Sequence, residues 1–442
     1  MSKFPVFALL VAGCLISCNK PRGYQELSAQ INKTDSCQIN TQHTYAIFIP
    51  AVEKTYKQLP LLVVIDPHGS GKYALTQFKE AATKYSVLMV SSNLVKNNYA
   101  GYLQALDELV QDVRSKYPVG NTIYLAGFSG GARMAIGYAS KHPVNGVIAC
   151  GALAQPEEIK AVNCPIYAIT GMDDFNFVEA ARFVLNPDKI PSNLLIEITH
   201  ASHAWPEKEV LTNALGYLSL SANTPGMAPQ PKSLTKAYVW QQKSRIDSLV
   251  NDAEILQAIL LSRNMSLVSA FEKKGDFKST YLKLLNEPVF AAQKEALSKS
   301  IQFELKVRDA YYNALQQKDT LWWGKEINSL QLKINSEKNL FARMAYKRIK
   351  GFLGIVCYSL GNRYASTKDL INLEKILSVY RMLEPGNSDM FFFSALDAQW
   401  RGNATLAVNN LVKAKEAGYS DLEKVRQNFS PTMVDSFIGS GN

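Results

Sequence analysis

The sequence predicts an α/β protein with a doubly wound, mostly parallel sheet, followed by an all-helical region. Three observations lead to this prediction. Apolar runs typical of buried strands alternate with amphipathic stretches from residue 36 to about residue 220, as in chains that form βαβ units. Residues 221–234 are rich in proline and small polar residues, which is typical of a linker. Beyond residue 235 apolar residues recur at helical spacing up to the end of the chain.

The predicted strands have the pattern of segments buried on one or both faces of a sheet. They are His43–Pro50, Leu59–Asp66, Ser86–Ser92, Asn121–Ala126, Asn145–Ala152, Cys164–Thr170 and Asn193–Thr199. The stretches between them show the three-and-four spacing of amphipathic helices. The clearest of these helices are Thr76–Tyr85, Tyr102–Tyr117 and Ala132–His142.

Within the helical region, residues 385–420 resemble a tetratricopeptide repeat. The segment has a turn at Pro385-Gly386-Asn387 and two predicted helices, Ser388–Trp400 and Ala404–Ala417. Large, small and turn residues fall at the positions that such a repeat uses. They are Phe391, Ala395, Ala398, Gly402, Ala407, Leu411 and Ala414. A degenerate repeat is expected before it, and an ordinary helical hairpin is the alternative.

The first residues have the pattern of an export signal. Lys3 supplies a positive charge, and Phe4–Ile16 is apolar but too short for an ordinary membrane span. Leu15-Ile16-Ser17-Cys18 resembles a bacterial lipobox, in which the cysteine becomes lipidated; Cys14 is preceded by a similar pattern. We therefore predict a signal at residues 1–18, a tether at 19–35, and a protein that Cys18 anchors to the cell envelope, facing the periplasm or the outside. A secretory signal without lipid is the alternative.

Composition restricts the function classes. The net charge is +10, but no run of five like charges and no basic stripe with aromatic residues is present, so nucleic-acid binding is not expected. The cysteines after Cys18 are Cys37, Cys150, Cys164 and Cys357. They lack metal-ligand spacing, and no metal or organic cofactor is expected. Whether any of them forms a disulfide is left open.

The pattern Gly127-Phe128-Ser129-Gly130-Gly131 lies between a predicted strand and a predicted helix. A strand, a tight turn with serine at its apex and a helix together form a nucleophile elbow, in which the serine hydroxyl projects from the sheet. The glycines allow strand and helix to pack closely around it. By itself this pattern is weak, because a glycine-rich turn with an idle serine looks the same.

A serine nucleophile needs a base and an acid that orients the base, and in this kind of sheet they follow in the order Ser, Asp, His. His200 and His203 both follow the last predicted strand, and we favour His203, which lies further into the loop. Asp173 and Asp174 follow the preceding strand; Asp174 is favoured as the acid, and Asp173 as a cap for the next helix.

The oxyanion of a reacting carbonyl needs backbone donors. The N–H of Gly130, just after the nucleophile, is one candidate. The other is expected from the loop after Leu59–Asp66, where His68, Gly69 and Ser70 are candidates for lining the oxyanion and substrate site. A tight strand-to-helix turn without this role is the alternative for that loop.

Four motifs in this order resemble the α/β-hydrolase superfamily, and most of all its small secreted esterases. These are polyhydroxybutyrate depolymerases, feruloyl and acetyl-xylan esterases and their dienelactone-hydrolase-like relatives. The motifs are His68-Gly69, Gly127-x-Ser129-Gly130-Gly131, Gly171-x-x-Asp174 and His203-Ala-Trp205-Pro206. The chain departs from the family pattern in its DPHGSG loop, at Phe177, and at Ala201-Ser202.

The resemblance implies a serine esterase in which Ser129, His203 and Asp174 act through an acyl-enzyme. It implies a small ester or an acylated glycan as substrate. A serine peptidase of the same fold is one alternative. Another is an envelope scaffold with a vestigial hydrolase domain, whose helical region binds a protein partner.

Overall fold

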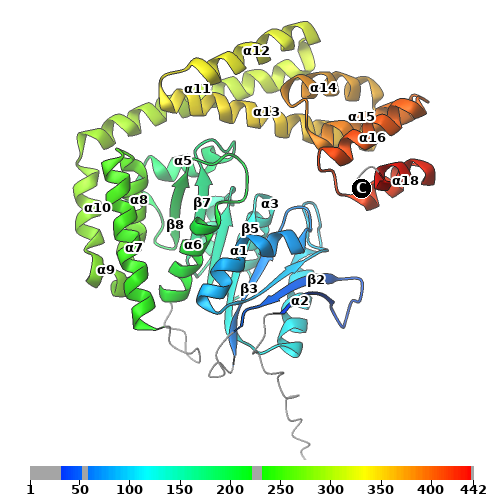
Figure 1. Ribbon diagram of the computed structural model, residues 1–442. Coiled ribbons are helices and arrows are strands. Elements are labelled where there is room, and N and C mark those ends of the chain that lie inside the picture. The colour runs from blue at the N-terminus through cyan, green and yellow to red at the C-terminus, as the bar shows by residue number, and fades with distance from the viewer. Residues whose placement is uncertain (1–30, 52–57, 222–230, 440–442) are drawn as a thin grey trace, which may run out of the picture.

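The computed structural model describes residues 31–51, 58–221 and 231–439 (Figure 1). The predicted signal with Cys18, most of the predicted tether and most of the predicted linker lie outside these residues. Within them no helix is both long and apolar enough to cross a lipid bilayer.

One eight-stranded sheet forms the centre of the α/β region (Figure 1). Its spatial order is β1-β2-β4-β3-β5-β6-β7-β8, and β3 to β8 run parallel, whereas β1 and β2 pair antiparallel with their neighbours. The strands are β1 Ile31–Ser36, β2 Thr44–Ile49, β3 Leu59–Ile65, β4 Leu88–Ser92, β5 Val119–Phe128, β6 Gly146–Cys150, β7 Ile166–Gly171 and β8 Leu194–Thr199. The predicted fold class, a mostly parallel sheet with helices, is confirmed.

Both faces of the sheet are buried, because successive strand residues point to opposite sides. In β3, Leu61 and Val63 belong to one apolar cluster, and Leu62 and Val64 belong to another. This explains the continuous apolar run of that segment.

Helices cover each face of the sheet. α1 Gly71–Tyr85 and α6 Lys208–Ser221 pack on one face, where they contact each other. The other face is covered by α2 Tyr102–Lys116, α3 Gly130–Ala139 and α5 Phe177–Val184, with the short α4 Pro156–Ala161 beside them. The sheet is therefore doubly wound, as the alternation of strands and helices predicts.

Strand β1 was not among the predicted strands, and it begins inside the stretch predicted as a tether. Its sequence, INKTDS, has no apolar alternation, and Asn32, Lys33 and Thr34 are exposed. Its backbone pairs with β2 over the whole strand, beginning where Ser36 lies opposite Thr44. A polar edge strand carries little sequence signal, because backbone hydrogen bonds rather than buried side chains hold it.

Four helices follow the predicted linker and cover the β8 edge of the sheet. They are α7 Lys232–Asn251, α8 Ile255–Ser266, α9 Ser269–Gly275 and α10 Phe277–Leu285. The side-chain amide of Asn264 donates to the carbonyl of Ile196 (2.9 Å) and accepts from the N–H of the same residue (3.3 Å). This side chain thus supplies the hydrogen bonds that a further strand would make, and the edge of the sheet is closed.

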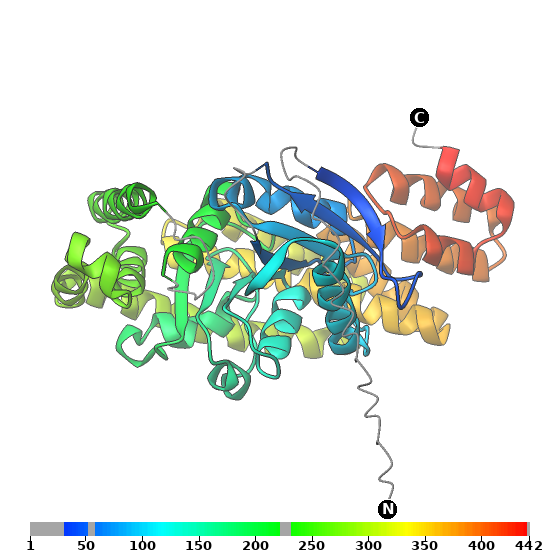
Figure 2. The ribbon, with the colours of Figure 1, turned by 90° about the horizontal axis from the view of Figure 1, so that it is seen from below.

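The remaining helices lie across the α/β region, and Figure 1 shows α11 to α14 passing over it. Figure 2 shows the last helices beside the α/β region at one end. Their bounds are α11 Pro288–Gln317, α12 Thr320–Ser336, α13 Leu340–Thr367, α14 Leu370–Leu383, α15 Ser388–Trp400, α16 Ala404–Glu416, α17 Leu422–Asn428 and α18 Pro431–Gly439.

The packing divides the helical region into two parts. α7 to α10, the first part of α11 and the start of α13 share apolar clusters with the sheet, whereas the end of α11, the rest of α13, α12 and α14 to α18 form a cluster of their own. The domain division at the linker stays a prediction. Helices α15 and α16 pack as a hairpin with a turn at Gly402, whose φ is +77°. Their classification as a tetratricopeptide-like repeat also stays a prediction.

Candidate active site

Ser129 lies at a sharp turn between β5 and α3. Its φ of 53° and ψ of −118° are strained values for a residue with a side chain. A Cβ placed on Gly127 would lie 2.3 Å from the backbone of Gly131, and one on Gly131 would lie 2.1 Å from the carbonyl oxygen of Ile65. The two glycines therefore allow the close contact of strand and helix that the elbow requires.

The structure brings Ser129, His203 and Asp174 together. The Oγ of Ser129 lies 3.0 Å from Nε2 of His203, and Nδ1 of His203 lies 2.9 Å from both carboxylate oxygens of Asp174. The three residues follow β5, β8 and β7 respectively. This geometry allows Nδ1–H to donate to the carboxylate, which leaves Nε2 free to accept the proton of the serine hydroxyl.

The two aspartates after β7 have different surroundings. Asp174 is 1% exposed, and its carboxylate also accepts a hydrogen bond from the N–H of Asn176 (2.8 Å). Asp173 instead pairs with Nζ of Lys347 in α13 at 2.6 Å. Asn176, not Asp173, occupies the N-cap position of α5. The structure thus directs Asp174 toward the imidazole and Asp173 toward the helical region.

Aromatic rings hold the imidazole of His203 from two sides. The ring centroid of Phe128 lies 4.7 Å from it and that of Phe175 lies 4.2 Å from it. Trp205 packs in turn against Phe128, with centroids 5.3 Å apart. The side chain of His203 is 21% exposed, so the imidazole is packed against aromatic rings but still reached by solvent.

The other histidines are engaged elsewhere. His200 pairs with Glu254 at the start of α8, with 2.8 Å between Nε2 and Oε1. His43 is buried, and Nε2 lies 2.8 Å from Oγ of Ser92. Burial lowers the pKa of His43, against the raising effect of the Glu108 charge. Neither histidine contacts Ser129 in the described structure.

The predicted oxyanion loop lies after β3, but its N–H groups are occupied. The N–H groups of His68 and Ser70 donate to Oδ1 of Asp66 at 2.8 and 3.2 Å, and that of Gly69 donates to the Asp66 carbonyl at 3.1 Å. The side chain of His68 is 78% exposed. A role of this loop in oxyanion binding stays a prediction. In the described conformation the N–H groups of residues 68–70 donate to Asp66 instead.

Gly130 opens α3, so no carbonyl one turn earlier in the helix accepts its N–H. A residue that the sequence reasoning missed lies against it: the side-chain amide of Asn97, in the loop after β4. A Cβ on Gly130 would lie 1.8 Å from Oδ1 and 3.3 Å from Nδ2 of Asn97. No sequence signal marks Asn97, because an exposed loop asparagine is ordinary.

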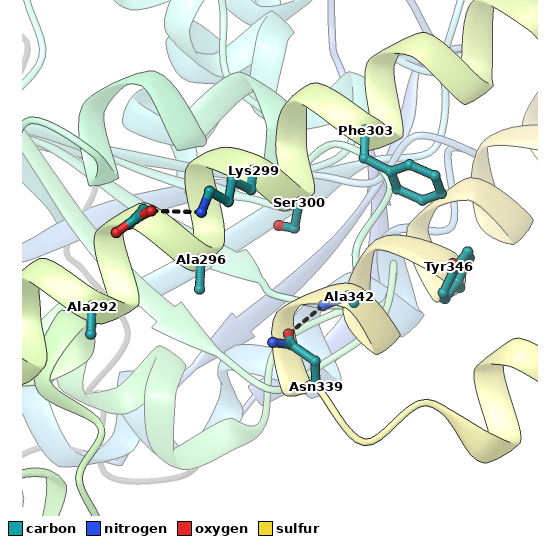
Figure 3. A pocket seen from close by; sticks show the side chains of 9 residues that line it. Ala292, Ala296, Lys299, Ser300, Phe303, Asn339, Ala342 and Tyr346 are labelled. Carbon is teal, nitrogen blue, oxygen red and sulfur yellow. Dashed lines mark hydrogen bonds and ion pairs between the residues drawn. The ribbon is translucent and has the colours of Figure 1, made fainter.

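The described structure has a hollow that none of these residues line. A cavity of about 460 Å³ lies between α11 and α13 (Figure 3). Its lining includes Lys299, Ser300, Phe303, Asn339 and Tyr346, and none of the candidate catalytic residues. This cavity is therefore separate from the candidate catalytic residues, which strands of the sheet position.

Two further observations concern the chemistry. The cysteines Cys37, Cys150, Cys164 and Cys357 are free and buried. Burial raises the pKa of the Cys150 thiol, which lies in the strand next to the elbow, and so disfavours a thiolate there. Among the described residues, no group of three or more His, Cys, Asp or Glu side chains is placed to hold a metal ion.

The strand order, the strand-turn-helix elbow after β5, and the aspartate and histidine after β7 and β8 are those of one known architecture. The fold is that of an α/β hydrolase. No protein-family model and no curated protein matches the sequence. Solved structures that resemble this fold include esterases, other hydrolases and a peptidase.

Three of them illustrate the range. Est1E from Butyrivibrio proteoclasticus is 12% identical, with a TM-score of 0.33, over 42% of this chain and 95% of its own. An S-formylglutathione hydrolase from Agrobacterium tumefaciens is 11% identical, with a TM-score of 0.35, over 43% of this chain and 95% of its own. The acylaminoacyl peptidase of Pyrococcus horikoshii is 11% identical, with a TM-score of 0.34, over 46% of this chain and 43% of its own. These low values carry no argument about activity.

Proposed function

We propose that the protein is a serine hydrolase that cleaves carboxylic esters through an acyl-enzyme. The observation that carries this proposal is the continuous chain of contacts from Ser129 Oγ to His203 (3.0 Å) and from His203 to the Asp174 carboxylate (2.9 Å). A hydroxyl, an imidazole and a buried carboxylate in this sequence of contacts are the parts that serine acylation needs.

The reaction follows from these contacts. Ser129 Oγ attacks the ester carbonyl carbon while Nε2 of His203 takes the hydroxyl proton. The C–O bond to the alcohol then breaks, and His203 returns that proton to the leaving alkoxide. Water, deprotonated by His203, attacks the acyl-serine and releases the carboxylic acid and the free hydroxyl of Ser129. Asp174 keeps the imidazole in the required tautomer and favours the imidazolium that forms transiently.

The oxyanion of each tetrahedral intermediate needs donors near the elbow. We assign one of them to the N–H of Gly130, which is free of a helical acceptor. The Nδ2 group of Asn97 is the second candidate donor, because this side chain lies against Gly130, although its Oδ1, which can only accept, is the nearer atom. The N–H groups of residues 68–70 instead donate to Asp66. Side-chain amides and backbone N–H groups both serve this purpose in hydrolases.

The test of this function uses a fluorophosphonate probe and short-chain nitrophenyl esters. The purified wild-type protein is expected to be labelled and to release nitrophenol. Ser129→Ala is expected to be unlabelled and to lose at least about 10³-fold in kcat. Ser140→Ala, in a serine that follows α3 away from the elbow, serves as the matched control. Equal labelling and activity of Ser129→Ala and the wild type would overturn the proposal.

Two alternatives are separated by the same assay. A peptidase would hydrolyse aminoacyl nitroanilides as well as esters of similar acyl groups, whereas an esterase would hydrolyse the esters alone. An envelope scaffold with an inactive hydrolase domain would resist the probe although it is folded. The intact contacts among Ser129, His203 and Asp174 favour an active enzyme, and small esters or acylated glycans are the substrate class we propose.

We also propose that the chain is exported and that Cys18 is lipidated, because the first residues resemble a lipoprotein signal. The helical hairpin α15–α16 would then offer a protein partner a surface at the envelope, as in tetratricopeptide repeats. Metabolic labelling with an alkyne fatty acid tests the anchor: the wild type should be labelled and retained in membranes, whereas Cys18→Ala should be neither.

A further inference from the structure

Three charged residues of the helical region form a buried group next to the active site. Glu304 and Arg308 belong to α11 and Arg348 belongs to α13; we call them the arginine cluster. The side chains of Glu304 and Arg348 are fully buried, and that of Arg308 is 8% exposed. Arg348 Nε donates to Glu304 Oε2 at 2.7 Å, and Arg308 Nη2 donates to Glu304 Oε1 at 2.5 Å.

The arginine cluster contains two positive charges and one negative charge, so one guanidinium charge is not balanced within it. Buried ions are costly unless their donors are satisfied. Two further hydrogen bonds reach the α/β region: Arg348 Nη1 donates to the carbonyl of Met172 at 2.6 Å, and Arg308 Nη2 also donates to the carbonyl of Phe175 at 2.7 Å. Among the described residues Arg308 Nε has no hydrogen-bond partner, and Arg348 Nη2 lies 2.6 Å from Glu304 Oε2 as an ion pair. The two guanidinium groups of the cluster thus donate hydrogen bonds to two backbone carbonyls of one loop.

That loop, residues 172–175, carries the proposed catalytic acid, and we call it the acid loop. The α/β region holds it through N–H groups, since Met172 N–H donates to the Thr199 carbonyl and Asp174 N–H donates to the Gly171 carbonyl. The helical region holds it through the carbonyls on either side of the two aspartates. Residues more than a hundred positions later in the chain therefore complete the support of this loop.

A second contact links the helical region to the base. The ring of Phe175 packs on the His203 imidazole, with centroids 4.2 Å apart. Gly351 of α13 lies against Phe175, since a Cβ built there would be 3.3 Å from Cδ1 of that ring. Helix α13 thus limits the movement of a ring that braces the imidazole.

The charges around Arg308 also favour an interaction between the arginine cluster and the acid loop. Burial lowers the pKa of Arg308, while the charges of Glu304 and, to a smaller extent, Asp174 oppose this. The Asp174 carboxylate therefore favours the charged form of Arg308, and the attraction is mutual. A positive charge from the helical region stands beside the acid of the triad.

We propose that the arginine cluster positions the acid loop, and thereby sets the alignment of Asp174 with His203. Its members are positioning residues, because they contact the carbonyls of the loop and not the reacting atoms. This inference rests on the proposed function, since alignment matters only if the triad acts. It makes the helical region a part of the active site in addition to any role in binding partners.

The experiment must separate positioning from folding. Glu304→Leu/Arg308→Met/Arg348→Met replaces the whole arginine cluster by apolar side chains of similar size, an exchange that is often neutral or stabilising for buried ion groups. The melting temperature should therefore stay at or above that of the wild type. With nitrophenyl acetate, kcat should fall on the order of 10²-fold while KM changes little, because the reacting groups are misaligned.

A loss of alignment should also move the midpoint of the acidic limb of the kcat profile against pH. A variant that merely contains less folded protein lowers the whole profile without moving it. Arg401→Met is the control: it removes an arginine of the same region whose ion pairs with Asp397 and Glu374 are largely exposed. We expect less than a twofold change in its kcat.

If the triple variant does not fold, Arg348→Lys keeps the charge but lacks the second guanidinium donor needed for both contacts. It should lose about tenfold in kcat, with the same shift of the profile. Folded cluster variants with wild-type kcat and profile would overturn this inference and leave the proposed function intact. A wild-type protein that neither reacts with the fluorophosphonate nor hydrolyses esters would instead overturn the proposed function.

Discussion

The α/β region carries the buried carboxylate of Asp174 within the acid loop, and the helical region carries the buried carboxylate of Glu304 between the two arginines that contact this loop. The two carboxylates are held in different ways. The carboxylate of Asp174 accepts a hydrogen bond from the backbone N–H of Asn176 and lies 2.9 Å from Nδ1 of His203. Glu304 lies between two guanidinium groups, which stay charged at any accessible pH. In the proposed mechanism the first carboxylate orients an imidazole and favours its protonated form, whereas the second only fixes geometry.

This difference teaches that burial of a carboxylate does not by itself indicate a catalytic role. The groups that contact the carboxylate indicate whether its role is catalytic or structural. A titratable partner that reaches a nucleophile indicates chemistry, and a permanent cation that reaches backbone carbonyls indicates support. The predictions below test this distinction, beginning with the largest expected effect.

Exchange of the α/β carboxylate should affect chemistry most. Asp174→Asn keeps the shape but favours the wrong imidazole tautomer, so kcat with nitrophenyl acetate should fall about 10⁴-fold at unchanged melting temperature. Asp173→Asn is its neighbour control, because Asp173 pairs with the half-exposed Lys347. We expect less than about a twofold change there. The reverse order of the two effects would reassign the acid to Asp173.

Exchange of the helical carboxylate should affect stability. Glu304→Ala leaves two buried guanidinium groups without their shared partner, which should lower the free energy of unfolding by about 3–5 kcal/mol. Urea denaturation followed by circular dichroism measures this. Glu374→Ala removes an exposed partner of Arg401 and should cost less than about 1 kcal/mol. Equal midpoints for both variants would show that the arginine cluster is not held by Glu304.

Loss of a hydrogen-bond donor to the oxyanion should have the next largest effect. Asn97→Ala removes the amide over Gly130 and should lower kcat about 10²-fold, or about 2.7 kcal/mol, if this amide donates to the oxyanion. Asn98→Ala, next to it in the same loop, is the control and should retain wild-type kcat. A normal kcat in Asn97→Ala would return the second donor to the loop at residues 68–70.

The smallest effect concerns a third carboxylate, at the edge of the sheet. Burial would raise the pKa of Asp35, but the hydrogen bond from Tyr117, with the Ser36 N–H and the charges of Lys116 and Lys33, lowers it to about 2. The pKa is lower in the folded chain than in the unfolded chain. The resulting stability is therefore present above about pH 4 and is lost as the pH falls toward 2.

After allowance for solvent screening this contribution is about 1 kcal/mol. Urea midpoints of the wild type and Asp35→Asn measure it: the two should differ at pH 7 and converge near pH 2. A difference that stays constant over this pH range would contradict the assignment. Because Asp35 is bonded to a hydroxyl and lysines but reaches no nucleophile, kcat should not change.

Much of the candidate site could be predicted from the sequence. Ser129 follows a β-rich segment and begins a helix, and the strands before Asp174 and His203 are also clear as apolar runs. The carboxyl ends of parallel strands meet at one edge of a sheet, so residues far apart in sequence but each next to a strand end can be expected to meet. The fold class follows from the same alternation.

Other features left no such pattern. The polar strand β1 pairs through its backbone, and the loop residue Asn97 contacts Gly130 only because two turns come together. The packing of α8 on β8 through Asn264 is equally invisible in the sequence. In each case the decisive contact joins separate segments through backbone groups or a single polar side chain.

By itself the sequence determined which residues stand at the ends of the strands, because apolar periodicity and glycine spacing are local properties of the chain. Only the tertiary structure decided that Glu304, Arg308 and Arg348 surround the acid loop. Along a helix these residues look like ordinary solvent-facing charges. Their burial and their hydrogen bonds to Met172 and Phe175 depend on how α11 and α13 cross the sheet, which is a long-range property that no local pattern encodes.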